Sequence, residues 1–349
     1  MIPWSQEAVT YNRSDIQRGF VSPSTFFRLF THLQMLPILE SGEETLVGGQ
    51  AVMEGVMMRA PHSYCVAVRK PSGEIVTEEK PLARMSEQYA IFKLPVFRGI
   101  GTLYQALKLG GQALKFSAAA ALDDPKLQAA NKKPDAEIPG WAMAAPIVVS
   151  LAFFLFAYKL VPLFLARELA TVYPALNGQV LSAVVDGVIR LVILLTLLFV
   201  ISRFKDIRRI FEYHGAEHKV VFNYEAGTPV NVENAQRFTT FHPRCGTSFL
   251  FVVFVIAIPV YAALPFTSFA AKFAARVVLI PLISGVAYEL IRFAAKRRGS
   301  LMAALTAPGL WMQRITTKPP ADDQAAVAIH ALEGAMSLEK SQGGELVIA

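Results

Sequence analysis

Charged residues and cysteines are both scarce in this chain of 349 residues. Asp, Glu, Lys and Arg together make up 17% of it, below the roughly 25% of a soluble domain. Hydrophobic residues make up 53%, and the mean hydropathy is +0.39. The two cysteines lie in segments that we expect in the cytosol, where structural disulfides are rare. This composition excludes disordered and disulfide-stapled proteins and indicates a membrane protein.

A net charge of +7 and a pI near 9.4 would suggest nucleic-acid binding in a soluble protein. The basic stretches lack the interleaved aromatic residues of a nucleic-acid platform, so we expect no nucleic-acid partner. The basic excess instead fits the Lys and Arg of cytoplasmic loops in a membrane protein. We expect no signal peptide, because the first 15 residues contain no apolar core.

Four segments have the length and apolar character of membrane spans. They cover residues 142–166, 181–201, 249–266 and 277–295, of which the last is the least apolar because it contains Glu289 and Arg292. The predicted fold class is therefore an α-helical polytopic membrane protein with about four transmembrane helices and a small cytoplasmic α+β N-terminal portion.

The distribution of Lys and Arg predicts the orientation of these spans. The loop between the second and third spans has seven of them, while the first and third loops have one and two. Lys296, Arg297 and Arg298 follow the fourth span. We therefore expect both termini and the long central loop on the cytoplasmic side.

The chain divides into six regions by these features. The N-terminal region should contain a glycine-rich turn over 48–60, strands over 63–69 and 74–79, and a helix over 96–121, and the tail should contain an amphipathic helix over 322–339. The regions are an N-terminal extension (1–45), a cytoplasmic α+β region with an amphipathic helix and a linker (46–141), a first transmembrane hairpin (142–201), a cytoplasmic loop (202–248), a second transmembrane hairpin (249–295) and a cytoplasmic tail with an interfacial segment (296–349).

The central loop contains an H-x-x-E-H motif formed by His214, Glu217 and His218. On a helix, residues four apart lie on one face. Two neutral imidazoles there can hold a divalent ion such as zinc, and the adjacent carboxylate can serve as a general base. The alternative is a hydrogen-bonded helix surface without a metal, in a helix that Gly215 could break.

A catalytic zinc site needs a third protein ligand, and the sequence offers several. Glu225 and Glu289 are carboxylate candidates, and His242 and Cys245 form an H-x-x-C motif before the third span. If His242 and Cys245 join His214 and His218, the site is closed and structural. If a carboxylate is the third ligand, one position stays open and the site is catalytic.

Five further residues are weaker candidates for a functional site. Asp186 and Arg190 stand four apart within the second span, either as a neutralising pair or as part of an ion path. Glu54 and Arg59 lie in the GGQAVMEGVMMR segment and could line the site, and Arg244 stands beside the H-x-x-C motif. The glycine-rich segment lacks the Gly-Lys-Ser/Thr ending of a phosphate loop.

Several motifs together carry a resemblance to a known family. The segments GGQAVMEGVMMRAP, YHGAEHKVVFNYE, FHPRCGTSFLF, YELIRFA and APGLWMQRITT resemble the YqhQ-like family of uncharacterised bacterial membrane proteins, over about residues 46–318. The family is labelled as predicted metal-dependent enzymes, which implies a divalent metal. The H-x-x-E-H motif alone also resembles the inverted zincins, in which a Glu further downstream is the third ligand. By that analogy the third ligand would be Glu289.

These observations lead to one hypothesis and one alternative. The hypothesis is a zinc-dependent hydrolase at the cytoplasmic face of the bacterial inner membrane, with a peptide or lipid-linked substrate. His214 and His218 would bind the metal, Glu217 would be the base, and Glu289 or Glu225 would complete the site. The alternative is a non-enzymatic membrane assembly or transport protein, with a structural His/Cys site or a charge pathway between its spans. A homo-oligomer and a membrane-protein substrate are compatible with both.

Overall fold

A four-stranded antiparallel sheet forms near the N-terminus of the computed structural model, which describes residues 47–122, 140–242, 245–296 and 300–341. Its strands pair in sequence order. They are β1 (Gly48–Val52), β2 (Gly55–Arg59), β3 (Ser63–Arg69) and β4 (Ile75–Pro81). A turn at residues 71–73 joins β3 and β4, and its Gly73 has a φ of 91°, which favours glycine. The predicted strands over 63–69 and 74–79 are confirmed.

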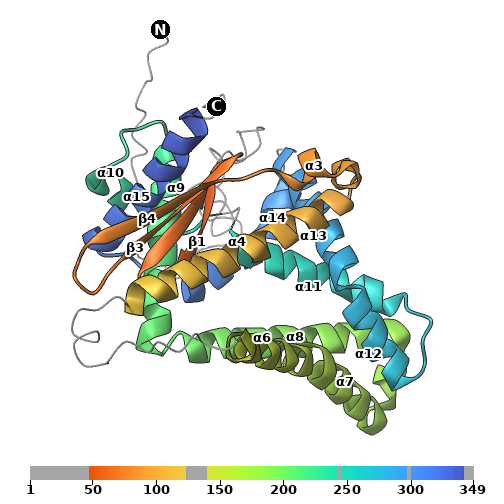
Figure 1. The fold of residues 1–349 in the computed structure, drawn as a ribbon. Helices are drawn as coiled ribbons and strands as arrows, with labels where there is room; N and C mark the ends of the chain where they lie inside the picture. The colour runs from red at the N-terminus through yellow and green to blue at the C-terminus, as the bar shows by residue number, and fades with distance from the viewer. Residues whose placement is uncertain (1–46, 123–139, 243–244, 297–299, 342–349) are drawn as a thin grey trace, which may run out of the picture. The chain divides into compact units, whose positions relative to one another are not determined.

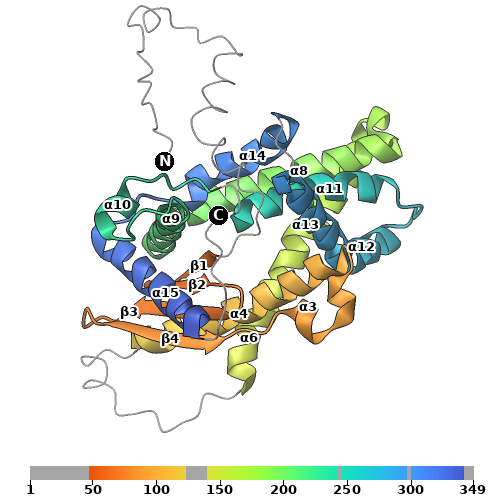
Figure 2. The same cartoon turned by 90° about the horizontal axis from the view of Figure 1, so that it is seen from above.

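Both faces of this sheet are covered by helices (Figures 1 and 2). Because side chains alternate along a strand, Val56 and Met58 face one side while Met57 faces the other. On the first side lie α9 (Lys205–Glu225) and α15 (Asp322–Ser341), and on the second lies α4 (Phe97–Leu122). The helix expected over 96–121 is thus confirmed as α4.

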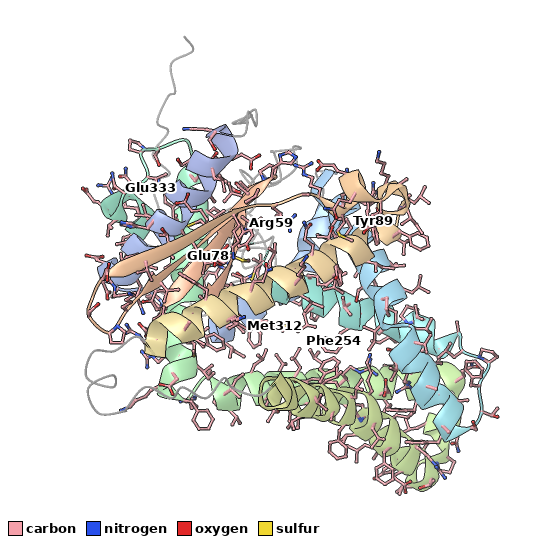
Figure 3. All side chains as sticks on the ribbon, in the orientation of Figure 1. Arg59, Glu78, Tyr89, Phe254, Met312 and Glu333 are labelled. Atoms are coloured by element: carbon pink, nitrogen blue, oxygen red, sulfur yellow. The ribbon has the colours of Figure 1, made fainter. Side chains whose placement is uncertain are left out.

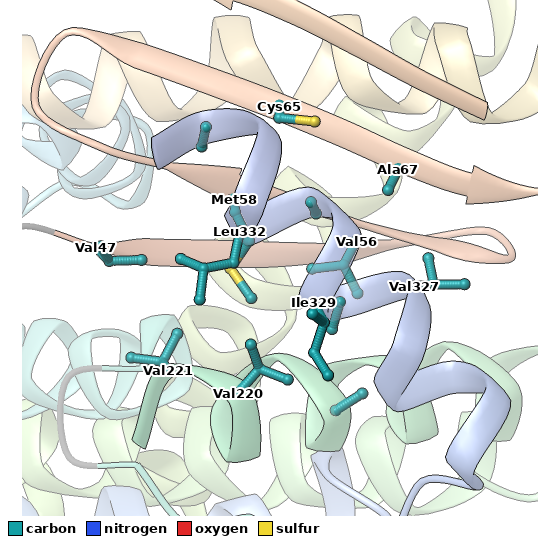
Figure 4. Close-up of a cluster of buried hydrophobic side chains, with 14 of the residues drawn as sticks. Val47, Val56, Met58, Cys65, Ala67, Val220, Val221, Val327, Ile329 and Leu332 are labelled. Carbon is teal, nitrogen blue, oxygen red and sulfur yellow. The ribbon is translucent and has the colours of Figure 1, made fainter. Parts of the chain in front are cut away.

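The C-terminal helix α15 is a core element rather than an amphipathic surface helix. Val327, Leu332 and their neighbours are buried against the sheet and against Val220 and Val221 of α9, as Figure 4 shows. Gly334 allows the close approach, since a Cβ there would lie 2.6 Å from Sγ of Cys65. The core of the sheet region therefore draws on three stretches of chain that are far apart in sequence.

Within the described residues, two helices are long and apolar enough to cross a membrane, or three if a bent pair is counted as one span. The first runs over Val148–Val172 through α6 (Gly140–Leu155), the π-helical turn η3 (Phe156–Leu160) and α7 (Val161–Val172); the second is α8 (Gln179–Ile201). These helices are compatible with a membrane protein, and their number, two or three, is smaller than the four spans that the sequence predicted.

The other two predicted spans fail for local reasons. α11 (Gly246–Ala262) is apolar but has only 17 residues, because the helix ends well before residue 266. The fourth segment, 277–295, begins at the break between α12 (Phe269–Val278) and α13 (Ile280–Lys296), two helices that are bent by 50° relative to each other. Pro281 lies at the start of α13, where its missing N–H and fixed φ favour a new helix over a continuous one.

The remaining elements connect these parts. α14 (Ser300–Thr316) packs against α11, and Gly309 permits the contact because a Cβ there would lie 2.6 Å from Cα of Ser248. Met312 of α14 and Phe254 of α11, both labelled in Figure 3, belong to one apolar cluster. The short elements are α3 (Met85–Gln88), η2 (Ala90–Lys93), η4 (Pro174–Asn177) and α10 (Val232–Gln236).

Candidate metal centre

The H-x-x-E-H motif lies in the middle of α9, which continues unbroken through Gly215. The glycine is required by packing: a Cβ at this position would lie 2.0 Å from the carbonyl oxygen of Lys318. The N–H of Lys318 also donates to the carbonyl of Phe211 at 2.9 Å. Gly215 thus lets the chain that links α14 to α15 cross directly over α9, and it does not break the helix.

Each imidazole of the motif is held by a main-chain carbonyl. His214 Nδ1 lies 2.8 Å from the carbonyl oxygen of Thr316, and His218 Nδ1 lies 2.5 Å from that of Thr240. A carbonyl only accepts, so each Nδ1 carries the hydrogen and each Nε2 keeps a free lone pair. The two ring centroids are 4.4 Å apart. This is the arrangement that orients histidines for metal binding.

Cys245 completes a set of three ligand atoms. It caps the N-terminus of α11, and its Sγ lies 3.1 Å from His214 Nε2. The ligand atoms of His214, His218 and Cys245 all lie within 4.8 Å of one another. Tetrahedral zinc would hold such atoms about 3.3–3.6 Å apart, so small side-chain shifts suffice. Two imidazole nitrogens and one sulfur are a donor set that suits zinc.

Glu217 is a buried carboxylate beside these ligands. Its Oε2 lies 3.4 Å from His218 Nε2, and the residue is 6% exposed. Burial raises the pKa of Glu217 to about 7, and a hydrogen bond from the Gly49 N–H opposes this effect. Gly49 stands in β1, and a Cβ there would lie 2.6 Å from Cγ of Glu217. The glycine-rich strand can therefore approach the carboxylate closely.

His242 and Glu225 lie near the centre but outside the three-ligand set. His242 Nε2 is 3.6 Å from Oε2 of Glu225, and its ring lies 4.6 Å from that of Phe222 and 5.5 Å from that of His218. Gln313 fixes the main chain of His242 by accepting from its N–H and donating to its carbonyl, both at 2.7 Å. The geometry therefore does not favour the closed, structural metal site in which His242 would be one of four ligands.

Glu289 does not reach the histidines. Its carboxylate accepts from the Arg98 side chain, with Nε at 2.6 Å, and from the N–H of Val96 at 3.1 Å. The analogy with the inverted zincins fails here because Glu289 belongs to α13, which packs against α4. The expectation that Glu289 supplies the third ligand is therefore corrected, and the residue that lies beside His214 is Cys245.

The candidates Glu54 and Arg59 lie in the sheet region, outside the three-ligand group. Glu54, in the β1–β2 turn with a φ of 52°, accepts two hydrogen bonds from Arg209 of α9 and one from the hydroxyl of Tyr213. Burial lowers the pKa of Arg59, at the end of β2, and the nearby Arg84 lowers it further. Arg244 lies outside the described residues.

Asp186 and Arg190 form a buried ion pair within α8. Thr240, Thr316 and Gly49 take part in the centre through main-chain atoms. Main-chain hydrogen bonding does not depend on side-chain identity, so the sequence carried no signal for these three.

Comparison with known proteins places the chain in a family. The family model described as "Protein of unknown function (DUF1385)" matches residues 94–338. The "Uncharacterized protein YqhQ" of Bacillus subtilis (strain 168) is 33% identical over 297 residues, which cover 84% of this chain and 92% of that protein. This chain belongs to the DUF1385 family. The family match extends past residue 318 and includes most of α15, in agreement with its place in the core. No solved structure matches.

Proposed function

We propose that this protein is a zinc-dependent hydrolase whose centre is formed by His214, His218, Cys245 and Glu217. One observation carries the proposal. Two imidazoles, each held through Nδ1 by a main-chain carbonyl, offer ligand atoms within 4.8 Å of each other and of the Cys245 sulfur, and a buried carboxylate stands next to them. Three protein ligands leave one tetrahedral position for water or substrate, as catalytic zinc sites do.

Each residue of the centre would have one role in metal binding or proton transfer. His214, His218 and Cys245 would hold the ion, which supplies Lewis-acid activation of a carbonyl or phosphoryl oxygen when bound. The carbonyls of Thr316 and Thr240 keep the imidazoles in the ligating tautomer. The Glu217 carboxylate takes the proton from the attacking water and returns it to the leaving group.

The position of the centre in the chain supports a substrate presented at a membrane surface. Cys245 is the residue that caps the apolar helix α11. α9 begins four residues after the end of the apolar helix α8. A peptide bond close to a membrane or an ester of a lipid-linked molecule would come within reach there.

A structural metal clamp is the second candidate, favoured by the burial of the centre. His218 is 1% exposed and Glu217 is 6% exposed. The ligands belong to α9 and to the start of α11, and the link between α14 and α15 crosses beside them. In this case Glu217 is the fourth ligand, no position stays open, and the ion joins parts of the fold that are distant in sequence.

The metal content of the detergent-purified protein distinguishes these candidates. We would compare wild type with His214→Ala, Cys245→Ala and Glu217→Gln, with the exposed His330 changed to Ala as the control. Zinc that is lost with His214 or Cys245 but retained in Glu217→Gln supports the three-ligand catalytic site. Zinc that is lost in Glu217→Gln as well supports the clamp. Chelator-free, folded wild type without any metal would refute both.

Activity is tested separately on peptides and lipid-linked esters. The hydrolase proposal requires that Glu217→Gln loses at least about 100-fold in rate, the usual contribution of a general base, while its metal content stays at the wild-type level. Equal rates in wild type and Glu217→Gln would refute the assigned role of Glu217.

A further inference from the structure

A group of buried charges lies among the apolar helices, away from the metal centre. We call it the cationic cluster, and it consists of Lys159 in η3, Asp186 and Arg190 in α8, and Arg276 in α12, around the ring of Tyr261 in α11. The four charged residues are between 1% and 8% exposed. Charged residues at such positions are costly and generally mark functional sites.

The side chains of the cluster bind one another closely. The two oxygens of the Asp186 carboxylate accept from different guanidinium groups, one from Arg190 and the other from Arg276. Lys159 Nζ donates to the Tyr261 hydroxyl at 2.9 Å. The guanidinium carbons of Arg276 and Arg190 lie 4.8 and 5.1 Å from the centre of the Tyr261 ring. The cations therefore converge on one small region.

The charges in this region do not balance. Two guanidinium groups, which stay protonated in proteins, share one carboxylate, and the amine of Lys159 lies beside the same ring. Among the residues that the structure describes, Asp186 is the only acidic side chain that pairs with these cations. An uncompensated charge in a low-dielectric region costs several kcal/mol. The cluster is thus short of at least one negative charge.

Two hydrogen-bond donors of the cluster also lack acceptors. Arg190 Nη1 and Arg276 Nε are both buried and have no partner within the described part of the chain. Both guanidinium groups bind the same carboxylate and lie against the same ring, so these two free donors belong to one site. Buried donors without acceptors are rare in native proteins and call for a bound group.

We propose that the cationic cluster binds a phosphate group, carried either by a phospholipid or by free inorganic phosphate. A phosphate supplies the missing negative charge and several acceptor oxygens, and the planar guanidinium fork fits its geometry. The inference does not depend on the proposed hydrolase, because the cluster shares no residue with the metal centre.

A shallow apolar hollow on the surface of the apolar helices lies next to an acyl chain's path from the cluster. The hollow is lined by Val180 of α8, by Ile258, Pro259 and Ala262 of α11, and by Ala263. Ile258 also packs against Gly187, where a Cβ would lie 2.7 Å from it. Gly187 directly follows Asp186 in α8, so one residue that lines the hollow contacts the helix that carries the cluster.

The test uses the full chain, delipidated in a phosphate-free maltoside detergent. Two arms separate the sources of the phosphate: binding of dioleoylphosphatidylglycerol compared with dioleoylglycerol, and binding of inorganic phosphate compared with sodium chloride at equal ionic strength. We expect phosphatidylglycerol or phosphate to bind and to raise the melting temperature, while dioleoylglycerol and sodium chloride do not. The arm that responds identifies the source.

Variants locate the site. Arg276→Gln should weaken binding about tenfold or more, the usual effect of losing a hydrogen bond to a charged group, and Lys159→Gln should weaken it because it removes an amine from the cluster. Arg167→Gln, an exposed arginine of α7, is the matched control and should bind like wild type. Absence of binding in both arms, or unchanged binding in Lys159→Gln and in folded Arg276→Gln, would overturn the proposal. If Arg276→Gln does not fold, Lys159→Gln decides alone.

Discussion

Replacing Gly215 by Ala tests the close contact between α9 and the chain that links α14 to α15, beside the metal centre. The added Cβ would lie 2.0 Å from the carbonyl oxygen of Lys318, and a main-chain oxygen cannot move aside without moving the link between α14 and α15. Overpacking of this kind costs about 1–3 kcal/mol, while the better helix propensity of Ala returns up to about 1 kcal/mol. We expect a net loss of about 1–2 kcal/mol in the free energy of unfolding.

The assay is thermal unfolding in detergent, with Gly111→Ala as a matched control. Gly111 is also inside a helix, α4, but a Cβ there would meet nothing within 4 Å, so this change should be neutral or stabilising. Gly215→Ala should also weaken zinc binding, because displacement of the link carries the Thr316 carbonyl away from His214. If Gly215→Ala raises the melting temperature as Gly111→Ala does, the Lys318 carbonyl does not pack against Gly215 as described.

Three further predictions concern pH, thiol reactivity and the excluded ligand. The hydrogen bond that the His62 ring donates to the Glu339 carboxylate raises the pKa of His62. The pair therefore contributes stability that is full below the unfolded pKa of about 6.5 and is lost as pH rises through the higher folded pKa. A profile of melting temperature against pH for His62→Gln should lack this loss. Burial raises the pKa of Cys65 to about 12, so mass spectrometry after alkylation of the folded protein should find Cys65 unmodified, and Cys245 should become reactive only after chelation of the metal. Glu289→Gln should keep the wild-type zinc content, and zinc loss in folded Glu289→Gln would restore the zincin analogy.

Short-range patterns predicted the local structure well. Alternating residues identified the strands over 63–69 and 74–79, and the spacing of His214 and His218 predicted their shared helix face. These features depend on neighbours in the sequence, which periodicity reports directly. The bent fourth segment was missed because an average over apolar residues does not register a helix break beside Pro281.

Long-range packing could not be predicted in the same way. The sequence offered several third ligands, and only the fold brings Cys245 rather than Glu289 to His214. The burial of α15 depends on the sheet and on α9, which lie far away in the chain. The tautomers of the two histidines depend on main-chain carbonyls that no residue pattern reveals.

X-ray absorption at the zinc edge tests the central claim most directly, because it identifies the atoms bound to the metal. The account predicts, in purified wild type, a first shell of two imidazole nitrogens at about 2.0–2.1 Å and one sulfur at about 2.3 Å, with the sulfur contribution absent in any zinc retained by Cys245→Ala. A zinc shell without sulfur in wild type, or folded protein that binds no zinc when the metal is supplied, would contradict it.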